Sequence, residues 1–183
     1  MKSQKNIWKN KSTVWITQGG VIAGIYVILT WVFSAFSFGE IQVRLSEALT
    51  IMPVFTPAAV PGLFVGCLLG NLLGSAVAAD TVFGSLATLI GAFLTRKLRN
   101  AHPAVALIPP ILSNALIVPF VLRYAYGVPT PIWMMMLTVG LGEVLSCGVL
   151  GLLLYYSLNR HRNLFALSPS ERTHGGRKEN GRK

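Results

Sequence analysis

Six apolar stretches, separated by short polar or proline-containing segments, organise most of the chain. The sequence predicts helices over residues 14–36, 46–55, 58–74, 81–95, 105–124 and 132–158. Apolar stretches of about 20 residues are typical of helices that cross a bilayer. The second stretch is shorter than a straight span requires, so we expect it to be short, tilted or shielded by its neighbours.

Basic residues gather before the first apolar stretch, after the fourth and after the sixth. Because Lys and Arg of short loops are retained in the cytoplasm, all three groups belong on that side, and the number of crossings between them is even. The sequence predicts an all-α integral membrane protein with six transmembrane helices in one bundle and cytoplasmic N- and C-termini. The three groups are Lys2, Lys5, Lys9 and Lys11; Arg96, Lys97 and Arg99; and Arg160 with Arg162.

This pattern divides the chain into three regions. Residues 1–12 form a basic cytoplasmic N-terminus, residues 13–160 the membrane domain, and residues 161–183 a basic tail that we expect to be disordered. The turn at residues 56–61 carries no charge, so the number of crossings there rests on parity and on Pro57 and Pro61.

Composition agrees with a membrane protein and excludes several other classes. The chain is 52% hydrophobic and only 12% charged, whereas about 25% of residues in soluble chains are charged. Its net charge of +10 lies in tails and one short cluster rather than on an aromatic-rich face, so we expect no nucleic-acid partner. Cys67 and Cys147 lie in apolar runs without metal-ligand spacing, and no phosphate-binding loop is present. We therefore expect no metal or cofactor in this chain and no ATP hydrolysis by it.

Polar residues inside apolar helices are costly and usually face a bundle interior or a cavity. The predicted topology gathers those of five segments in the outer half of one bundle. Each has a structural alternative, since Arg44 would pair with Glu40 or Glu47, Asp80 would cap a helix, and the amides would link helices. Glu143 favours a functional role most strongly because its helix offers no basic partner. The set is Glu40, Gln42, Arg44, Glu47, Asn71, Asp80, Ser113, Asn114 and Glu143.

The acidic excess of this set favours a cationic or donor-rich solute. Aromatic residues at the same rim, among them Tyr126 and Trp133, are typical of an interfacial belt but would also suit a lid that stacks on a planar ligand. A strip of small residues on the first helix allows close approach of another helix, either inside the bundle or in a partner subunit. This strip consists of Gly19, Gly20, Ala23 and Gly24.

Several motifs resemble one family over residues 20–158. They are EIQVRLSEALTIMPVF at residues 40–55, PGL from Pro61, GCLLGN at residues 66–71 and DTVFGSLATL at residues 80–89, and they are similar to the queuosine-precursor transporter family, QueT. The resemblance implies the substrate-binding S component of an energy-coupling factor (ECF) transporter in the bacterial plasma membrane. Such a component has six helices, an outward-facing site, and a small-residue strip that contacts a coupling subunit. Here glycines replace the more usual alanines of that strip.

The same resemblance implies the solute, 7-aminomethyl-7-deazaguanine, and the partners. A transmembrane coupling subunit and two ATPase subunits, which hold ATP and Mg, would drive import, and the chain itself would be no enzyme. A carboxylate accepts the paired donors of a guanine-like edge, and a second neutralises the amine. Glu143 or Glu47 would bind the base, and Asp80 or the other Glu the amine. The substrate-binding candidates are Glu47, Asn71, Asp80, Asn114, Glu143, Arg44 and Trp133; the docking candidates are Gly19, Gly20, Ala23 and Gly24.

Two other functions remain open from the sequence. A stand-alone proton-coupled secondary transporter would use Glu143 and Asp80 as a relay, although no internal repeat supports this. An intramembrane enzyme would need a nucleophile or metal cluster, and the histidines His102, His161 and His174 lie at the cytoplasmic end or in the tail.

Overall fold

The computed structural model describes residues 2–33, 44–74 and 77–160, and within these ranges it contains helices and no strands. Each of the six predicted segments is helical, with α5 and α6 together forming the fifth, and α7, η2 and α8 the sixth. The elements are α1 (Lys2–Val32), the 3₁₀ helix η1 (Leu45–Val54), α3 (Ala59–Leu73), α4 (Ala78–Lys97), α5 (Pro103–Ala106), α6 (Ile108–Tyr124), α7 (Ile132–Glu143), the π-helix η2 (Val144–Leu150) and α8 (Gly151–Asn159).

Four helical stretches are long and apolar enough to cross a membrane, namely Ser12–Val32, Ala78–Lys97, Pro103–Tyr124 and Ile132–Asn159. The apolar helices η1 and α3 are shorter. The all-helical class is therefore confirmed for the described residues, with four candidate membrane spans, whereas six complete spans and cytoplasmic termini stay predictions. The first helix begins at Lys2, well before the predicted residue 14. The predicted tail, residues 161–183, lies outside the described residues.

Side-chain contacts at the two ends of the bundle define the helix directions. At one end, Arg44 before η1 contacts Asp80 in the first turn of α4. At the other, Arg96 in the last turn of α4 donates a 2.9 Å hydrogen bond to the carbonyl of Pro53 near the end of η1. Thus η1 and α4 run parallel. We call the first end of the bundle the Asp80 end and the second the Arg96 end.

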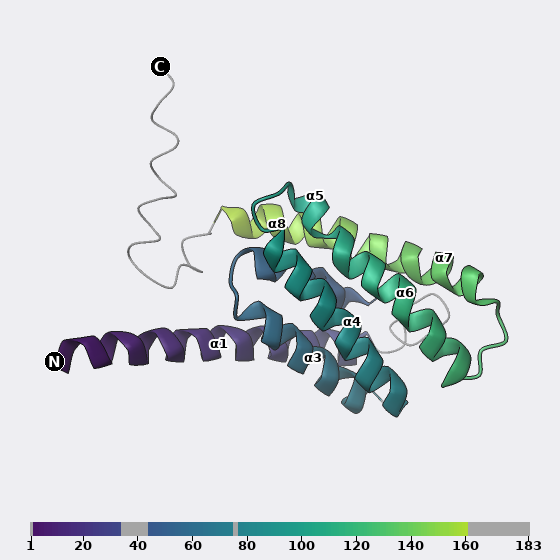
Figure 1. The fold of residues 1–183 in the computed structure, drawn as a ribbon, viewed down its shortest axis with the longest axis horizontal. Coiled ribbons are helices and arrows are strands. Elements are labelled where there is room, and N and C mark those ends of the chain that lie inside the picture. Colours follow the sequence, from purple (N-terminus) through teal and green to yellow (C-terminus); the bar gives the residue numbers. More distant parts are fainter. Residues whose placement is uncertain (1, 34–43, 75–76, 161–183) are drawn as a thin grey trace, which may run out of the picture.

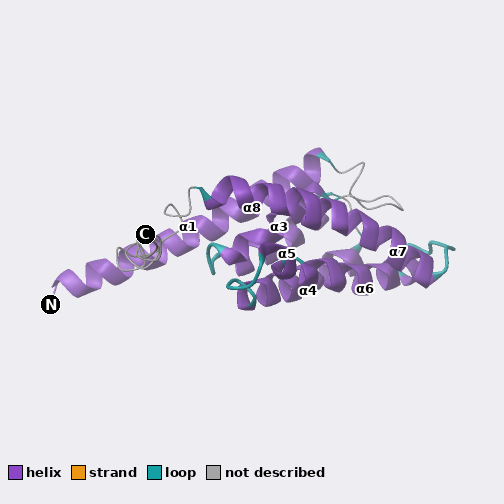
Figure 2. Cartoon of the chain, turned by 90° about the horizontal axis from the view of Figure 1, so that it is seen from above, coloured by secondary structure: helices purple, strands orange, loops and turns teal. Residues whose placement is uncertain are grey.

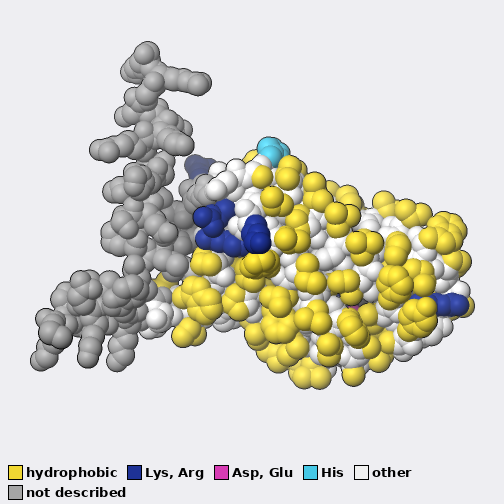
Figure 3. Space-filling model, in the orientation of Figure 1, with side chains coloured by type: hydrophobic (Ala, Val, Ile, Leu, Met, Phe, Trp, Pro, Cys, Tyr) yellow, Lys and Arg dark blue, Asp and Glu magenta, His cyan; other side chains and the backbone are white. Residues whose placement is uncertain are grey.

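The three chain regions that carry the basic groups lie toward the same end of the molecule. The N-terminus, the end of α4 and the end of α8 all lie on the left in Figure 1. Viewed from above, α1 projects beyond the other helices at its N-terminal end (Figure 2). Lys and Arg side chains gather on the left of Figure 3, and hydrophobic side chains cover most of the remaining visible face. Such an apolar surface suits contact with lipid chains.

The second predicted segment, η1, is buried. Its 3₁₀ winding makes it longer than an α-helix with the same number of residues. A 3₁₀ helix rises about 2.0 Å per residue against about 1.5 Å in an α-helix, so the ten residues of η1 extend about 20 Å. Eight of them, including all from Leu49 to Val54, are buried. We expected this segment to be short, tilted or shielded by its neighbours, and the structure shows that it is shielded.

Close packing of α1 against α3 depends on glycines from both helices. A Cβ atom on Gly62 would lie 2.6 Å from the carbonyl oxygen of Gly19, and one on Gly66 would lie 3.0 Å from the Cα of Ala23. A Cβ atom does not fit at 2.6 Å from a backbone atom, and at 3.0 Å the neighbouring helix would have to shift. Gly19 and Ala23 therefore pack inside the bundle, as the structural alternative predicted.

The other half of the small-residue strip points away from the bundle. Gly20 and Gly24 are exposed, and a Cβ atom built on either would have nothing within 4 Å. These two glycines leave open space on the exposed surface of α1, so within the strip only Gly20 and Gly24 remain candidates for docking.

We predict that Gly62→Ala destabilises the protein by about 1–3 kcal/mol, because the added methyl group collides with the backbone of α1. Gly20→Ala is the matched control, since it adds the same group in open space and improves helix propensity. Thermal unfolding in detergent measures both. Equal melting temperatures for the two variants would contradict the α1–α3 packing.

Candidate functional site

Two irregular helices bring two glutamates together in the middle of the bundle. Glu47 lies in the first turn of η1, and Glu143 is the last residue of α7, directly before the π-helix η2. η1 and η2 contact each other, and the two side chains are only 0% and 2% exposed. Segments of π-helix are rare and frequent at functional sites.

Glu143 is held by two neighbours. The Asn114 side-chain amide donates a 2.9 Å hydrogen bond to Glu143 Oε1, and the Cys147 thiol lies 3.1 Å from Oε2. The predicted equal depth of Asn114 and Glu143 is thus observed. Ser113 instead donates to the carbonyl of Pro110 in its own helix, 3.1 Å away.

Glu47 is bound on one oxygen only. The Tyr26 hydroxyl donates to Oε1, and the Thr88 hydroxyl lies 3.3 Å from the same atom. Oε2 is buried and has no hydrogen-bond partner within the described ranges; the same holds for Asn114 Oδ1 and Ser146 Oγ. Since a buried polar atom without a partner is costly, this surplus of acceptors favours a ligand that brings donors.

The acidic groups lie close enough to share one cation. Ligand atoms of Glu47, Glu143 and Cys147 all lie within 4.8 Å of one another. Two ionised carboxylates this close repel each other, so a proton, a metal ion or an ammonium group between them would stabilise the pair. These three residues, together with Asn114, are the carboxylate cluster.

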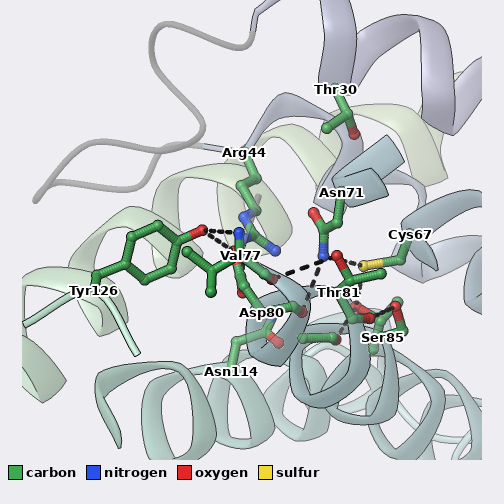
Figure 4. A network of polar contacts seen from close by, with 12 residues as sticks. Thr30, Arg44, Cys67, Asn71, Val77, Asp80, Thr81, Ser85, Asn114 and Tyr126 are labelled. Carbon is green, nitrogen blue, oxygen red and sulfur yellow. Dashed lines mark hydrogen bonds and ion pairs between the residues drawn. The ribbon is translucent and has the colours of Figure 1, made fainter. Parts of the chain in front are cut away.

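A second polar network closes the Asp80 end of the bundle (Figure 4). Arg44 Nη2 lies 3.2 Å from Asp80 Oδ2, and both side chains are buried. The Tyr126 hydroxyl donates to the same carboxylate over 3.1 Å and accepts the Val77 backbone N–H over 3.2 Å. Partial burial raises the pKa of Tyr126 above its usual value, so the hydroxyl keeps the proton that it donates. Arg44, Val77, Asp80 and Tyr126 form the Asp80 network.

This network bears on two expectations. Among the described residues, Arg44 forms an ion pair with Asp80; Glu40, one of its two expected partners, lies outside the described residues, as does Gln42, so that pairing stays a prediction. Asp80, one candidate for the solute amine, is ion-paired with the Arg44 guanidinium, whereas Glu47 and Glu143 have no cationic partner among the contacts described.

Two other candidates have surroundings that fit the structural alternatives, and their roles in solute binding stay predictions. Asn71 is buried and donates to the backbone carbonyl of Asp80 over 3.3 Å, which links α3 to α4 beside the Asp80 network. Trp133 lies near the start of α7 and is 66% exposed, so the structure does not bring it to the carboxylate cluster.

Sequence reasoning missed three residues of the site. Thr88 and Tyr26 contact Glu47 from α4 and α1, and Cys147 contacts Glu143 from η2. Cys147 was findable, because it follows Glu143 by four residues and so shares its helical face. Tyr26 and Thr88 carried no signal that separated them from ordinary core residues.

A sequence model of the QueT transporter family matches residues 16–160. The chain belongs to the QueT transporter family. The matched range contains the carboxylate cluster and the Asp80 network of this QueT protein, and it supports a membrane transporter rather than an enzyme. Searches of curated proteins and of solved structures give no match.

We predict that Arg44→Met destabilises this QueT protein by about 3–5 kcal/mol, because it leaves the Asp80 carboxylate buried without its cation. The double variant Arg44→Met/Asp80→Leu should recover much of that loss. Arg123→Met is the control, since Arg123 is exposed. In the contact described, it donates a hydrogen bond to the backbone carbonyl of Val128 in a loop. Unfolding in detergent gives the comparison, and equal losses for the two arginine variants would contradict a stabilising ion pair.

Proposed function

We propose that this QueT protein is the solute-binding S component of an ECF importer in the bacterial plasma membrane. It captures 7-aminomethyl-7-deazaguanine, or a close deazapurine, outside the cell. A coupling subunit and two ATPase subunits, which carry ATP and Mg, supply the energy for import. The proposal includes six crossings with both termini in the cytoplasm, so that the Asp80 end faces outward. The observation that carries it is the buried Glu47–Glu143 pair with unpartnered acceptor atoms.

The chemistry of the solute suits this pair. A deazaguanine edge presents a ring N–H and an exocyclic amine, and the aminomethyl group adds a cation, so the ligand brings donors to a cluster that has spare acceptors. Because Arg44 neutralises Asp80, we assign the ammonium group to the Glu47–Glu143 pair. The free Oδ1 of Asn114 would accept a further donor from the base.

The open surface of α1 supports docking of the coupling subunit. Gly20 and Gly24 leave space on an exposed, otherwise apolar helix face, which lets a partner helix approach closely. Gly19 and Ala23 already pack against α3, so the proposed docking strip reduces to Gly20 and Gly24.

A second candidate is a stand-alone proton-coupled transporter of a small cationic solute. The adjacency of Glu47 and Glu143 favours it, because such a pair exchanges a proton for a cation readily. The expected relay through Asp80 is less suitable now that Arg44 holds that carboxylate. Uptake into vesicles that contain this protein alone, driven by a pH gradient, would establish the second candidate and exclude the first.

We predict that Glu143→Gln weakens binding of 7-aminomethyl-7-deazaguanine by about 10- to 100-fold, since a charge-assisted hydrogen bond contributes about 1.5–3 kcal/mol. Binding of the neutral 7-hydroxymethyl analogue should change much less. Isothermal titration calorimetry of the purified protein measures both affinities.

Ser113→Ala is the control for this experiment, because Ser113 lies beside Asn114 but bonds within its own helix. Its affinity for the charged solute should equal that of the unaltered protein. Equal weakening of both ligands by Glu143→Gln would show that the carboxylate does not bind the ammonium group. Absence of binding to either ligand would refute the proposed solute.

We predict that Gly20→Leu/Gly24→Leu abolishes uptake into cells but leaves solute affinity unchanged, because the leucines fill the docking strip and point away from the carboxylate cluster. Ala78→Leu is the control, since it adds bulk at an exposed position on α4. Cellular uptake, solute binding and co-purification with the coupling subunit are measured together. Full uptake by the double variant would mean that the partner docks elsewhere.

A further inference from the structure

The carboxylate cluster is sealed in this structure. Glu47, Glu143 and Cys147 are at most 2% exposed, so no solute reaches them without a rearrangement. On α4, the Asp80 network lies eight residues before Thr88, which contacts Glu47; this corresponds to about 12 Å along the helix. The network thus lies between the carboxylate cluster and the Asp80 end of the bundle.

One link of the network is fixed by burial and tight packing. The Arg44 and Asp80 side chains are 2% and 1% exposed. A Cβ atom on Gly84, one turn further along α4, would lie 3.0 Å from Asp80 Oδ1 and 3.1 Å from Asn71 Nδ2. The ion pair therefore sits in a space with no room to spare, and separating its charges in this setting is costly.

The other link is weaker and closer to the surface. Tyr126 is only partly buried and holds Asp80 through one hydroxyl. It lies in the connection between α6 and α7, directly before Gly127. Among the described glycines, Gly127 has a positive φ, of +68°. Glycine adopts this backbone conformation without strain, so the chain can turn sharply there. A single hydrogen bond from a neutral hydroxyl at such a position breaks more easily than the buried ion pair, in which both partners are charged.

We infer that the hydrogen bonds of the Tyr126 hydroxyl are what breaks when the Asp80 end opens toward the carboxylate cluster. Opening separates Tyr126 from Asp80 and Val77 and leaves the Arg44–Asp80 pair intact; we call Tyr126 the release point. Tyr126 is a positioning residue that controls access and does not touch the solute. The inference rests on the proposed function only for the identity of the solute, because the opening itself is a property of the chain.

The first test uses no solute. In a Cys67→Ala background, the rate at which 2-aminoethyl methanethiosulfonate modifies Cys147 reports how often the cluster opens. Tyr126→Phe should raise this rate about 10- to 100-fold, the effect of losing a hydrogen bond to a charged group of about 1.5–3 kcal/mol. Tyr124→Phe is the control, because Tyr124 is 78% exposed and nearby in sequence; its rate should not change. An unchanged rate in Tyr126→Phe overturns the inference.

The second test follows the kinetics of radiolabelled 7-aminomethyl-7-deazaguanine. Tyr126→Phe should raise the association and dissociation rate constants by a similar factor, so that Kd changes less than about twofold. A weaker Kd with an unchanged association rate would assign Tyr126 to solute contact and overturn its positioning role. If the labelled compound binds neither protein while Cys147 modification accelerates in Tyr126→Phe, the proposed solute fails and the release point stands.

Discussion

The 3₁₀ winding of η1 aligns two polar residues of this QueT protein, directly after the extended residue Arg44. In a 3₁₀ helix, residues three apart eclipse one another, which aligns Glu47 and Thr50. Arg44 contacts Asp80 of α4, Glu47 contacts Tyr26 of α1, and Thr50 lies 3.3 Å from the Cys147 sulfur of η2. An α-helix of the same residues would be shorter and would spread these two side chains around its axis. Arg44 and η1 thus contact three other helices.

The bundle places a carboxylate that has a cationic partner at one depth and two carboxylates without one at another. At the Asp80 end, an arginine and an aspartate neutralise each other; in the centre, two glutamates share only neutral donors among the contacts described. Such an arrangement is stable only if a proton or a cation joins the glutamates, because a low-dielectric interior strengthens their repulsion. The compensated pair therefore lies near the Asp80 end, and the uncompensated glutamates lie deeper in the bundle.

The sequence predicted the helical segments and the meeting of Asn114 with Glu143, because hydropathy and topology determine depth along a helix. It could not predict the partner of Arg44, since that choice depends on the rotation of η1, and apolar patterning does not distinguish 3₁₀ from α winding. Trp133 is 66% exposed near the start of α7, which suits the interfacial belt that the sequence also allowed, and its contact with a solute stays a prediction.

Glycine placement explains why the α1 strip divides between two roles. Gly19 and Ala23 face α3, where Gly62 and Gly66 leave no room for larger side chains, whereas Gly20 and Gly24 lie about 100° further round the helix and face open space. A single run of small residues therefore makes two smooth surfaces rather than one. The inner surface fixes α1 against the bundle that holds Tyr26 next to Glu47. Any force on the outer surface would therefore act on a helix that is already coupled to the carboxylate cluster through Tyr26.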